Sequence, residues 1–219
     1  MRSRHADRFN HDEDAPGYDA DVLREEHPIR AGYAAALDWV VERAAVTGSD
    51  EVLDLGTGTG NLIARLPDFA SLTAVDVSEA MLELAAGKFG GDDRVNWVQD
   101  DLLGFFDCPG PAYDAVISTY ALHHLTYDEK QALFEAIGTR LAPGARVLFA
   151  DLMFESPAER ARILDAYRAA GDGDLVSLIE DEFFWDVEPA AAAWRELGFT
   201  VETHRLSTLS WGLAARSRV

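Results

Sequence analysis

Four short apolar runs, each followed by a segment with helical spacing, constrain the fold of this chain most. The runs are EVLDL (51–55), SLTAVDV (71–77), YDAVIST (113–119) and ARVLFADL (145–152), with a weaker candidate strand at RVNWVQ (94–99). Strands with one face in water alternate apolar and polar residues, whereas these runs are almost uniformly apolar. That pattern is typical of parallel strands covered on both faces. Strand alternating with helix predicts a doubly wound α/β sheet.

The two ends of the chain depart from this alternation. Residues 1–27 are polar and acidic and predict an arm with little order of its own. Pro28 is predicted to open a helix that Gly48 ends, because proline suits the first helical turn and glycine the end. Residues 199–217 offer two strands and a short turn without a helix, which predicts an antiparallel pair at one sheet edge. Ser78 and Ser156 are predicted helix caps, and Ser156 begins a Ser-Pro-Ala-Glu capping box.

Composition limits the class of protein and its partners. The length of 219 residues suits one domain, and 39 acidic against 19 basic residues give a formal net charge of −20. Such a surface repels polyanions, so nucleic acid and anionic membranes are not expected as partners. The acidity serves solubility or favours a neutral or cationic substrate. No apolar run approaches the roughly 18 residues that span a bilayer, the N-terminus has no apolar signal segment, and Cys108 is the only cysteine. We expect a cytoplasmic protein, either a monomer or a homodimer.

A glycine-rich turn follows the first strand. In EVLDLGTGTGNL (51–62), Gly56, Gly58 and Gly60 stand at alternate positions, where backbone can come close to a ligand. A triphosphate loop is excluded because it requires Gly-Lys-Ser/Thr. The dinucleotide fingerprint places its third glycine where Asn61 stands, which argues against an NAD(P)-dependent oxidoreductase but leaves it as an alternative. Asp76, at the end of the second strand, can accept hydrogen bonds from ribose hydroxyls under either remaining interpretation.

Further acidic residues favour S-adenosylmethionine as the ligand. Asp54 lies two residues before the turn, where a carboxylate is awkward beside a pyrophosphate but suits the cationic sulfonium and ammonium groups. WVQDDLL puts Asp100 and Asp101 at the end of the third strand, where a carboxylate can accept from an adenine amino group. All three residues lie at carboxyl ends of strands, which form the ligand-binding edge of an open α/β sheet.

Five sequence blocks together carry a family resemblance. VLDLGTGTG, AVDVS, VQDDLL, YDAVISTYALHHL and LAPGARVLFADL have the order and spacing of the class I S-adenosylmethionine-dependent methyltransferases. The resemblance covers roughly Tyr18 to the C-terminus, with residues 28–219 as the methyltransferase domain. GTGTGNL, STYALHHLTYDEK and LFADLMFES are most similar to a YrrT-type group of small-molecule methyltransferases. The resemblance implies a Rossmann-like, seven-stranded sheet that is mostly parallel with an antiparallel C-terminal strand pair. It also implies methyl transfer to N, O or S of a small molecule, with S-adenosylhomocysteine as the product.

The same resemblance implies roles for individual residues. The glycine turn approaches the amino-acid part of the cofactor, Asp76 holds the ribose and Met81 lies near the adenine. Asp101 binds the adenine amino group, although Asp100 is the alternative. Two residues at the end of the fourth strand form the floor beneath the sulfonium. The complete set of expected cofactor-binding residues is Asp54, Gly56, Thr57, Gly58, Gly60, Asp76, Val77, Met81, Asp100, Asp101, Leu102, Ser118 and Thr119.

Candidate residues for the acceptor lie in STYALHHL, after the fourth strand. Tyr120 and His123 are expected to contact the substrate, and histidine is a suitable general base at neutral pH. By the resemblance, His124 matches a base of some amine methyltransferases of this fold, assisted by a tyrosine of the arm, here Tyr18. Alternatively, His124 only packs in the following helix. Metal binding by His123 and His124 is not expected, because neighbouring side chains diverge on a helix and no third ligand is evident.

Two segments are predicted to border the site. The arm, residues 1–27, is a candidate cover, and residues 172–187 are a candidate lid or interface segment. The second segment carries Phe183, Phe184 and Trp185 beside acidic residues, which predicts either a cage for a cationic amine or aromatic side chains that face the core. A non-catalytic protein that binds S-adenosyl ligands stays a further alternative, because no sequence feature excludes it.

Overall fold

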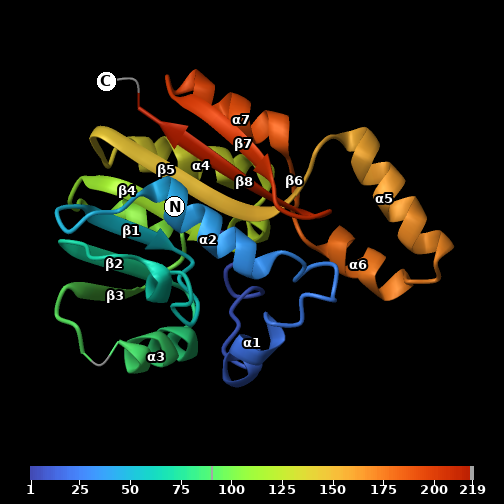
Figure 1. The fold of residues 1–219 in the computed structure, drawn as a ribbon, viewed down its shortest axis with the longest axis horizontal. Coiled ribbons are helices and arrows are strands. Elements are labelled where there is room, and N and C mark those ends of the chain that lie inside the picture. Colours follow the sequence, from blue (N-terminus) through green and yellow to red (C-terminus); the bar gives the residue numbers. More distant parts are fainter. Residues whose placement is uncertain (90, 218–219) are drawn as a thin grey trace.

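A mostly parallel sheet forms the centre of the protein (Figure 1). The computed structural model describes residues 1–89 and 91–217, so residue 90 and the end of the predicted domain 28–219 lie outside the described residues. The strand order is β3-β2-β1-β4-β5-β8-β7, with β8 antiparallel to β5 and to β7. The predicted sheet with its antiparallel C-terminal pair is confirmed. The strands are β1 (Glu51–Leu55), β2 (Ser71–Asp76), β3 (Val95–Gln99), β4 (Tyr113–Thr119), β5 (Leu141–Phe154), β7 (Thr200–Arg205) and β8 (Ser210–Arg216), and the two-residue β6 (Trp185–Asp186) pairs with β5.

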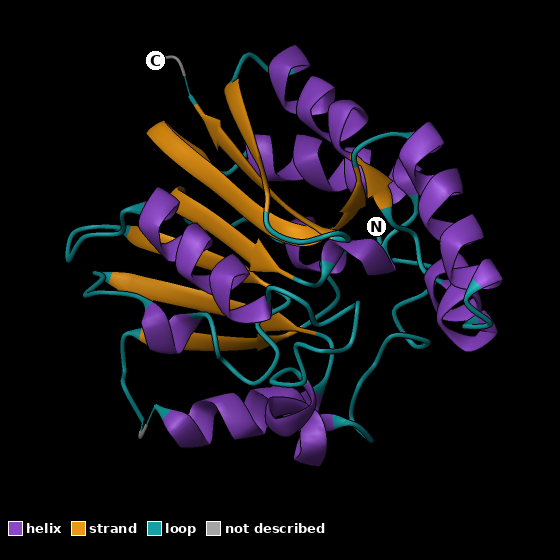
Figure 2. Ribbon diagram, turned by 45° about the vertical axis from the view of Figure 1, so that its right-hand side comes forward, coloured by secondary structure: helices purple, strands orange, loops and turns teal. Residues whose placement is uncertain are grey.

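Helices cover both faces of this sheet (Figure 2). Helix α2 (Tyr33–Ala44) packs on one face, and α4 (Tyr127–Gly138) and α7 (Val187–Glu196) pack on the other. Successive residues of β1 therefore face different cores, with Val52 in the cluster of α2 and Leu53 in the cluster of α4 and α7. This double coverage is why the strands are apolar throughout. The remaining helices are α1 (Ala15–Asp21), α3 (Glu79–Lys88), α5 (Pro157–Ala169) and α6 (Gly173–Asp181).

Several helix boundaries differ from the sequence prediction. Helix α2 begins at Tyr33 rather than at Pro28, because Gly32 has a left-handed backbone with φ of 80°. It ends before Ala45, whose φ of 45° stops the helix three residues ahead of Gly48. The predicted Ser78 cap is confirmed, since its side chain accepts from the Met81 amide at 3.1 Å.

Two predictions of local structure need correction. The segment between β1 and β2 forms only a 3-10 turn, η1 (Ile63–Arg65), where a helix was expected. Pro67 lies two residues after this turn, and proline cannot donate the hydrogen bond that a longer helix would need there. Ser156 caps α5 as predicted, but the Glu159 carboxylate accepts from the Glu155 amide instead of closing the box at Ser156.

The arm, residues 1–27, is dark blue in Figure 1 and lies at the carboxyl ends of the parallel strands. It includes α1, which lies next to α3. Two aspartates hold it there. Asp12 accepts hydrogen bonds from the Ser78 hydroxyl at 2.6 Å and the Ala80 amide at 3.2 Å. Asp19 accepts from the Thr59 hydroxyl at 2.5 Å and lies 2.7 Å from the Lys88 ammonium nitrogen. These contacts place the arm over the glycine turn and over the start of α3.

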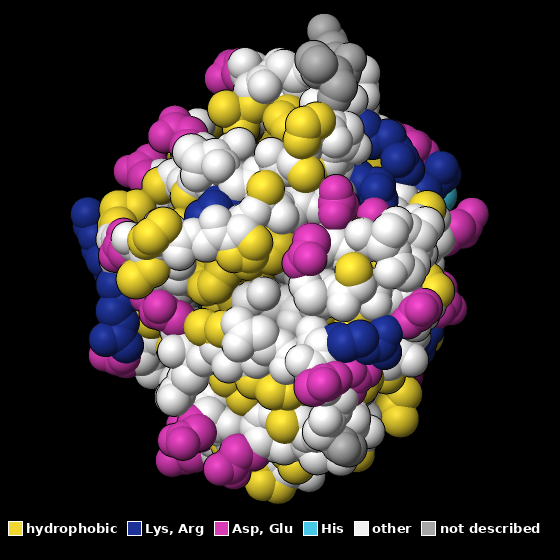
Figure 3. Space-filling view, turned by 90° about the vertical axis from the view of Figure 1, so that its left-hand side faces the viewer, with side chains coloured by type: hydrophobic (Ala, Val, Ile, Leu, Met, Phe, Trp, Pro, Cys, Tyr) yellow, Lys and Arg dark blue, Asp and Glu magenta, His cyan; other side chains and the backbone are white. Residues whose placement is uncertain are grey.

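Charge is distributed rather than concentrated on the face in Figure 3. Asp and Glu side chains are spread there among hydrophobic and uncharged groups, and Lys and Arg lie mostly toward the two sides. Within the described residues, every helix is too short or too polar to cross a lipid bilayer.

Candidate active site

A cavity of about 450 Å³ opens at the carboxyl ends of β1, β2 and β4 and is bounded by the arm. Most of the residues predicted to bind cofactor or acceptor line it together. Asp54, Gly60, Asp100 and Ser118 do not line it. The predicted residues that do line the cavity are Tyr18, Gly56, Thr57, Gly58, Asp76, Val77, Met81, Asp101, Leu102, Thr119, Tyr120, His123 and His124.

The glycine turn needs glycine for two different reasons. At Gly56, with φ of 73°, a Cβ atom would lie 2.2 Å from the Cβ of Ala121, so no side chain fits. At Gly58, with φ of 53°, a Cβ atom would meet none of the described residues within 4 Å, and the backbone is open to the cavity. The Gly58 amide donates to Asp76 Oδ2 at 2.7 Å, which joins the turn to the end of β2.

Two carboxylates lie at this turn, the half-buried Asp76 and the buried Asp54. Asp76 Oδ1 also accepts from the Ser78 amide at 2.9 Å, and burial raises the pKa of the Asp76 carboxyl. Asp54 lies behind the turn, 1% exposed, and its Oδ2 accepts from the Thr57 hydroxyl at 2.6 Å. Burial raises the pKa of Asp54 to about 7, and the nearby Asp76 adds to this effect. A cation in the cavity would favour the ionised form of both groups.

Asp101 presents an unfilled acceptor beside the cavity. Its Oδ1 accepts from the amides of Ser3, Leu103 and Gly104 at 3.0 to 3.2 Å. Its Oδ2 is buried and has no hydrogen-bond partner among the described residues, and the nearest cation, Arg2 Nε, is 3.8 Å away. Buried carboxylate oxygens are normally hydrogen-bonded, so this atom can accept a further donor. The alternative residue, Asp100, instead accepts from the Asp101 amide at 2.8 Å.

The end of β4 forms the floor of the cavity. The Ser118 hydroxyl donates to the Leu55 carbonyl at 2.6 Å and so holds β4 to β1 rather than facing the cavity. Tyr120 has a left-handed backbone with φ of 51°, which is strained for a tyrosine. Its hydroxyl lies 3.0 Å from the Ser210 hydroxyl, and its amide donates to Ala150 at 2.9 Å. These bonds to β8 and β5 hold the strained residue in place.

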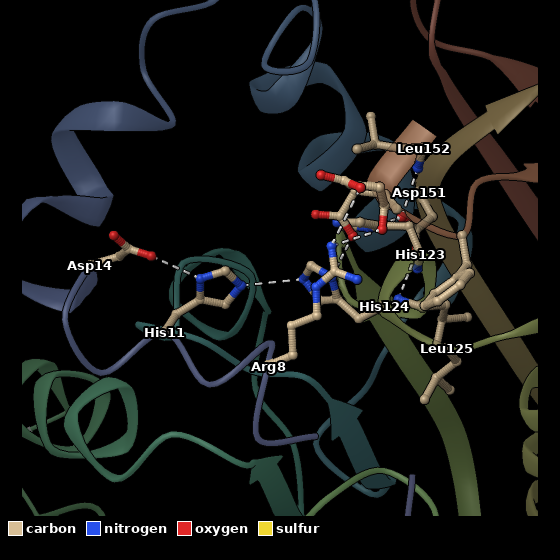
Figure 4. Close-up of polar contacts among 12 residues, drawn as sticks. Arg8, His11, Asp14, His123, His124, Leu125, Asp151 and Leu152 are labelled. Carbon is tan, nitrogen blue, oxygen red and sulfur yellow. Dashed lines mark hydrogen bonds and ion pairs between the residues drawn. The ribbon is translucent and has the colours of Figure 1, made fainter. Parts of the chain in front are cut away.

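A chain of hydrogen bonds runs from the arm to the segment after α6 through two histidines (Figure 4). Asp14 Oδ2 lies 3.0 Å from His11 Nδ1, and His11 Nε2 lies 3.3 Å from His124 Nε2. His124 Nδ1 in turn lies 3.0 Å from Glu182 Oε2. Burial, reinforced by the adjacent His123, lowers the pKa of His124 to about 4 even though Glu182 opposes this change. His124 is therefore neutral at pH 7.

His123 has its own carboxylate partner. It lies with His124 in the 3-10 turn η3 (Leu122–His124), and its Nδ1 is 2.6 Å from Asp151 Oδ1. Asp151 Oδ2 accepts from the backbone amides of Leu122 and His123 at 2.6 and 3.2 Å. The His123 ring thus has a fixed orientation at the edge of the cavity.

Aromatic side chains of the arm complete the cavity wall. Phe9 stacks on His124 with ring centroids 4.3 Å apart. Tyr18 lines the cavity, and burial raises the pKa of its phenol well above 10, so the hydroxyl stays protonated. The Arg30 guanidinium lies 5.7 Å from the Tyr18 ring and pairs with Asp21 at 2.9 Å.

The segment 172–187 meets the cavity through Leu178 and Glu182 only. Phe184 and Trp185 are each 5% exposed and pack in the core, and the Phe183 ring lies 4.9 Å from that of His5 in the arm. The three aromatic side chains therefore do not form a cage, and for Phe184 and Trp185 the alternative prediction of core-facing side chains is confirmed. Phe184 lies in the cluster of α2, and Trp185 lies in the cluster of α4 and α7.

Sequence reasoning missed the cavity residues Phe9, His11, Arg30, Tyr33 and Glu182. His11 meets His124 across 113 positions of the chain, and Glu182 meets it across 58. The sequence predicts only that the segments containing His11 and Glu182 border the site. No spacing in the sequence pairs these residues, because tertiary contacts alone bring them together.

Comparison with known proteins identifies the family. Residues 52–144 match a methyltransferase domain model. The uncharacterized methyltransferase YrrT of Bacillus subtilis is 32% identical over 188 residues, which is 85% of each chain. A similar methyltransferase of Bacillus pumilus is 31% identical over 189 residues, 85% of this chain and 84% of its own.

Solved structures share the fold. A DhpI complex with S-adenosylhomocysteine gives a TM-score of 0.69 at 22% identity, covering 94% of this chain and 93% of the other. The N-methyltransferase NodS of Bradyrhizobium japonicum, also with S-adenosylhomocysteine, gives 0.65 at 15% identity, covering 86% and 89%. The cavity lies at the carboxyl ends of the strands, which is the edge where open α/β sheets bind ligands. The chain belongs to the S-adenosylmethionine-dependent methyltransferases, in the group that includes YrrT.

Proposed function

We propose that this methyltransferase acts on a small-molecule acceptor, at a nitrogen, oxygen or sulfur atom. The observation that carries this proposal is that the arm, the glycine turn and η3 line one common cavity. Its volume of about 450 Å³ lies in the range of small-molecule sites. An acceptor beside His124 would share this covered space with the cofactor. Family membership removes the oxidoreductase alternative.

The cofactor is proposed to occupy the part of the cavity between the glycine turn and Asp101. The open backbone at Gly58 suits its amino-acid part, and Asp76 at the end of β2 suits the ribose hydroxyls. The unfilled Oδ2 of Asp101 suits the adenine amino group, with Met81 beside the ring. Asp54 acts from behind the turn, as an ionised group that favours the cationic end of the ligand.

Methyl transfer is an in-line displacement, so the protein mainly aligns the reactants and excludes water. We propose that residues 1–27 cover the site and that residues 172–187 border it through Glu182. The contacts of Asp12 and Asp19 with the domain support this role, because they hold the arm across the cavity.

His124 and Tyr18 are proposed to act on the acceptor, which approaches from the side of η3. Because His124 is neutral and only weakly basic, it cannot by itself take a proton from an ammonium group. A neutral imidazole accepts a hydrogen bond or coordinates a cation. Tyr18 remains protonated, so its hydroxyl positions the acceptor instead of serving as a base.

We propose that the protein works in the cytoplasm, as a monomer or homodimer, without a nucleic-acid or membrane partner. The net charge of −20 supports this, because it opposes binding to polyanions. The single cysteine, Cys108, is free and exposed, as suits a reducing compartment.

Replacing Asp76 with alanine should weaken S-adenosylhomocysteine binding at least tenfold, because hydrogen bonds to a charged group contribute about 1.5–3 kcal/mol. Isothermal titration calorimetry measures this affinity, and the thermal midpoint checks that the variant folds. Asp165→Ala is the matched control, since Asp165 is exposed and pairs with Arg168. Equal affinities of a folded Asp76→Ala and the parent would contradict the cofactor site.

Binding of S-adenosylmethionine should weaken by about tenfold between pH 7.5 and pH 5, because Asp54 with its pKa of about 7 becomes protonated. The bound cation lowers this pKa, so the affinity is full above pH 7 and falls as the pH drops through it. Asp54→Asn should remove most of this slope. If the affinity of Asp54→Asn falls with pH in the same way as that of the parent, the ionisation of Asp54 does not contribute to binding.

Methyl transfer from labelled S-adenosylmethionine should occur to one chemical class in a panel of small amines, alcohols, thiols and carboxylates. Mass spectrometry identifies the methylated product, and Asp76→Ala is the inactive control. Transfer to protein or nucleic acid alone would refute the small-molecule acceptor. Tight S-adenosylhomocysteine binding without transfer to any acceptor would favour the non-catalytic alternative.

Once an acceptor is known, Tyr18→Phe should lower kcat roughly tenfold or more, because a misplaced acceptor loses alignment with the methyl group. Affinity for S-adenosylhomocysteine should change less than about twofold, since removing one neutral hydroxyl costs little when the cofactor does not depend on it. Tyr167→Phe serves as the control, because Tyr167 packs on the core outside the cavity. An unchanged kcat in Tyr18→Phe would remove Tyr18 from the catalytic residues.

A further inference from the structure

The hydrogen-bond chain from Asp14 to Glu182 ends in a carboxylate that lies against a ring nitrogen. It contains three contacts, Asp14–His11, His11–His124 and His124–Glu182. In the last of them, Glu182 Oε2 is 3.0 Å from His124 Nδ1, and both side chains line the cavity.

His123 provides a second ring nitrogen beside the pair of His124 and Glu182. Asp151 occupies its Nδ1 at 2.6 Å, which leaves Nε2 as the nitrogen that His123 can offer. A carboxylate on the far nitrogen is the usual partner of a metal-binding histidine, because it fixes the tautomer and the ring orientation. His123, His124 and Glu182 offer ligand atoms that all lie within 4.8 Å of one another.

We propose that His123, His124 and Glu182 form a binding site for a divalent transition-metal ion, such as zinc, at the acceptor end of the cavity. The ligands are Nε2 of His123, Nδ1 of His124 and the Glu182 carboxylate. Two imidazoles and one carboxylate suit zinc and its neighbours in the first transition row, whereas magnesium and calcium prefer oxygen ligands alone.

In this assignment every hydrogen bond of the cluster has one donor. The ion replaces the proton between His124 Nδ1 and Glu182, so His124 Nε2–H donates to His11 Nε2. His11 Nδ1–H then donates to Asp14, and His123 Nδ1–H donates to Asp151. Asp14 and His11 thereby orient the His124 ring, and Asp151 orients the His123 ring (Figure 4).

The fold overturns the reason for which metal binding was not expected from the sequence. Glu182 supplies the third ligand, and the backbone pins it beside the histidines, because the Phe183 amide donates to the His123 carbonyl at 2.9 Å. His124 Nδ1 and Glu182 Oε2 are already 3.0 Å apart, close to the roughly 3.3 Å between ligands of a tetrahedral ion with 2.0–2.1 Å bonds. Because the ligand atoms lie within 4.8 Å of one another, binding requires them to close by about 1.5 Å at most.

All three ligands line the cavity, so the open coordination position faces the acceptor. The role of the ion in catalysis rests on the proposed function. A Lewis acid beside the acceptor lowers the pKa of its O–H or N–H group, and the proton leaves to solvent. The acceptor lone pair then forms the bond to the methyl carbon, while the electrons of the broken C–S bond remain on sulfur. Acceptors with a metal-binding oxygen or nitrogen are therefore expected.

The test is calorimetric titration of the metal-stripped full chain with Zn²⁺, without acceptor. One ion per chain should bind with a dissociation constant near or below about 1 μM. Glu182→Gln and His124→Ala should each weaken binding at least about a hundredfold, and His11→Ala by roughly 10- to 100-fold, as for other groups that orient a metal ligand. S-adenosylhomocysteine binding verifies that each variant folds.

Two matched controls alter a carboxylate and a histidine outside the proposed site. Glu180→Gln alters an exposed carboxylate two positions from Glu182 that pairs with Arg168, and His204→Ala alters an exposed histidine far from the cavity. Both should bind Zn²⁺ as the parent does. Co²⁺ should give a visible absorption band of a nitrogen-ligated site in the parent and in Glu180→Gln, but not in Glu182→Gln.

Failure to bind one ion per chain, or equal affinity in Glu182→Gln and Glu180→Gln, overturns the site. Either result leaves the proposed function intact, because binding is measured without methyl transfer. If the ion binds but no small molecule is methylated, the proposed function is overturned and the metal site stands. Full transfer by chelator-treated protein, verified to be free of metal, overturns the catalytic role of the ion.

Discussion

The part of the cavity around the two histidines depends on Asp151, a carboxylate that is 2% exposed in β5. A buried charge costs several kcal/mol unless it is paired and hydrogen-bonded. Here the amides of Leu122 and His123 and the His123 ring supply the donors, so the turn after β4 must lie against β5. His124 follows in the chain, and the Phe183 amide bonds back to His123. One buried charge therefore fixes three segments that would otherwise be independent loops.

A second buried charge supports the same region from α4. Lys130 donates to the carbonyls of Leu125 and Phe183, and burial lowers the pKa of its ammonium group to about 7. These bonds join Leu125, which follows η3, to Phe183, which follows Glu182. The region around the two histidines is thus polar but well connected, and its rigidity comes from charges that can be satisfied in one arrangement only.

Sequence reasoning predicted the parts of the molecule in which local pattern and tertiary structure agree. The strands follow from their uniform apolarity, and the Ser78 cap follows from a serine placed directly before a helical run. The positions of Asp76 and Asp101 beside the cavity follow from their places at strand ends. The predicted helix boundaries at Pro28 and Gly48 were wrong, because the left-handed residues Gly32 and Ala45 limit α2 within them. The missing helix before Pro67 shows that one proline can outweigh a helical spacing.

The remaining features could not be predicted from local pattern. His11 and Glu182 belong to acidic segments whose composition fits a solvated surface, and only folding places them beside His124. The sequence of the aromatic run at 183–185 does not show that Phe184 and Trp185 enter the two core clusters while Phe183 packs on the arm. Asp100 and Asp101 are equivalent in the sequence, whereas in the structure only Asp101 both reaches the cavity and holds the arm.

The contact of Asp101 with the arm has a thermodynamic consequence. One oxygen of Asp101 accepts from the Ser3 amide, the other is buried without a hydrogen-bond partner among the described residues, and the residue lines the cavity. Where two equilibria share a group, the free energy by which one favours the other is the same in both directions. A ligand that bonds to Asp101 and thereby favours the docked arm is itself bound more tightly when the arm is docked, by the same factor in each equilibrium constant.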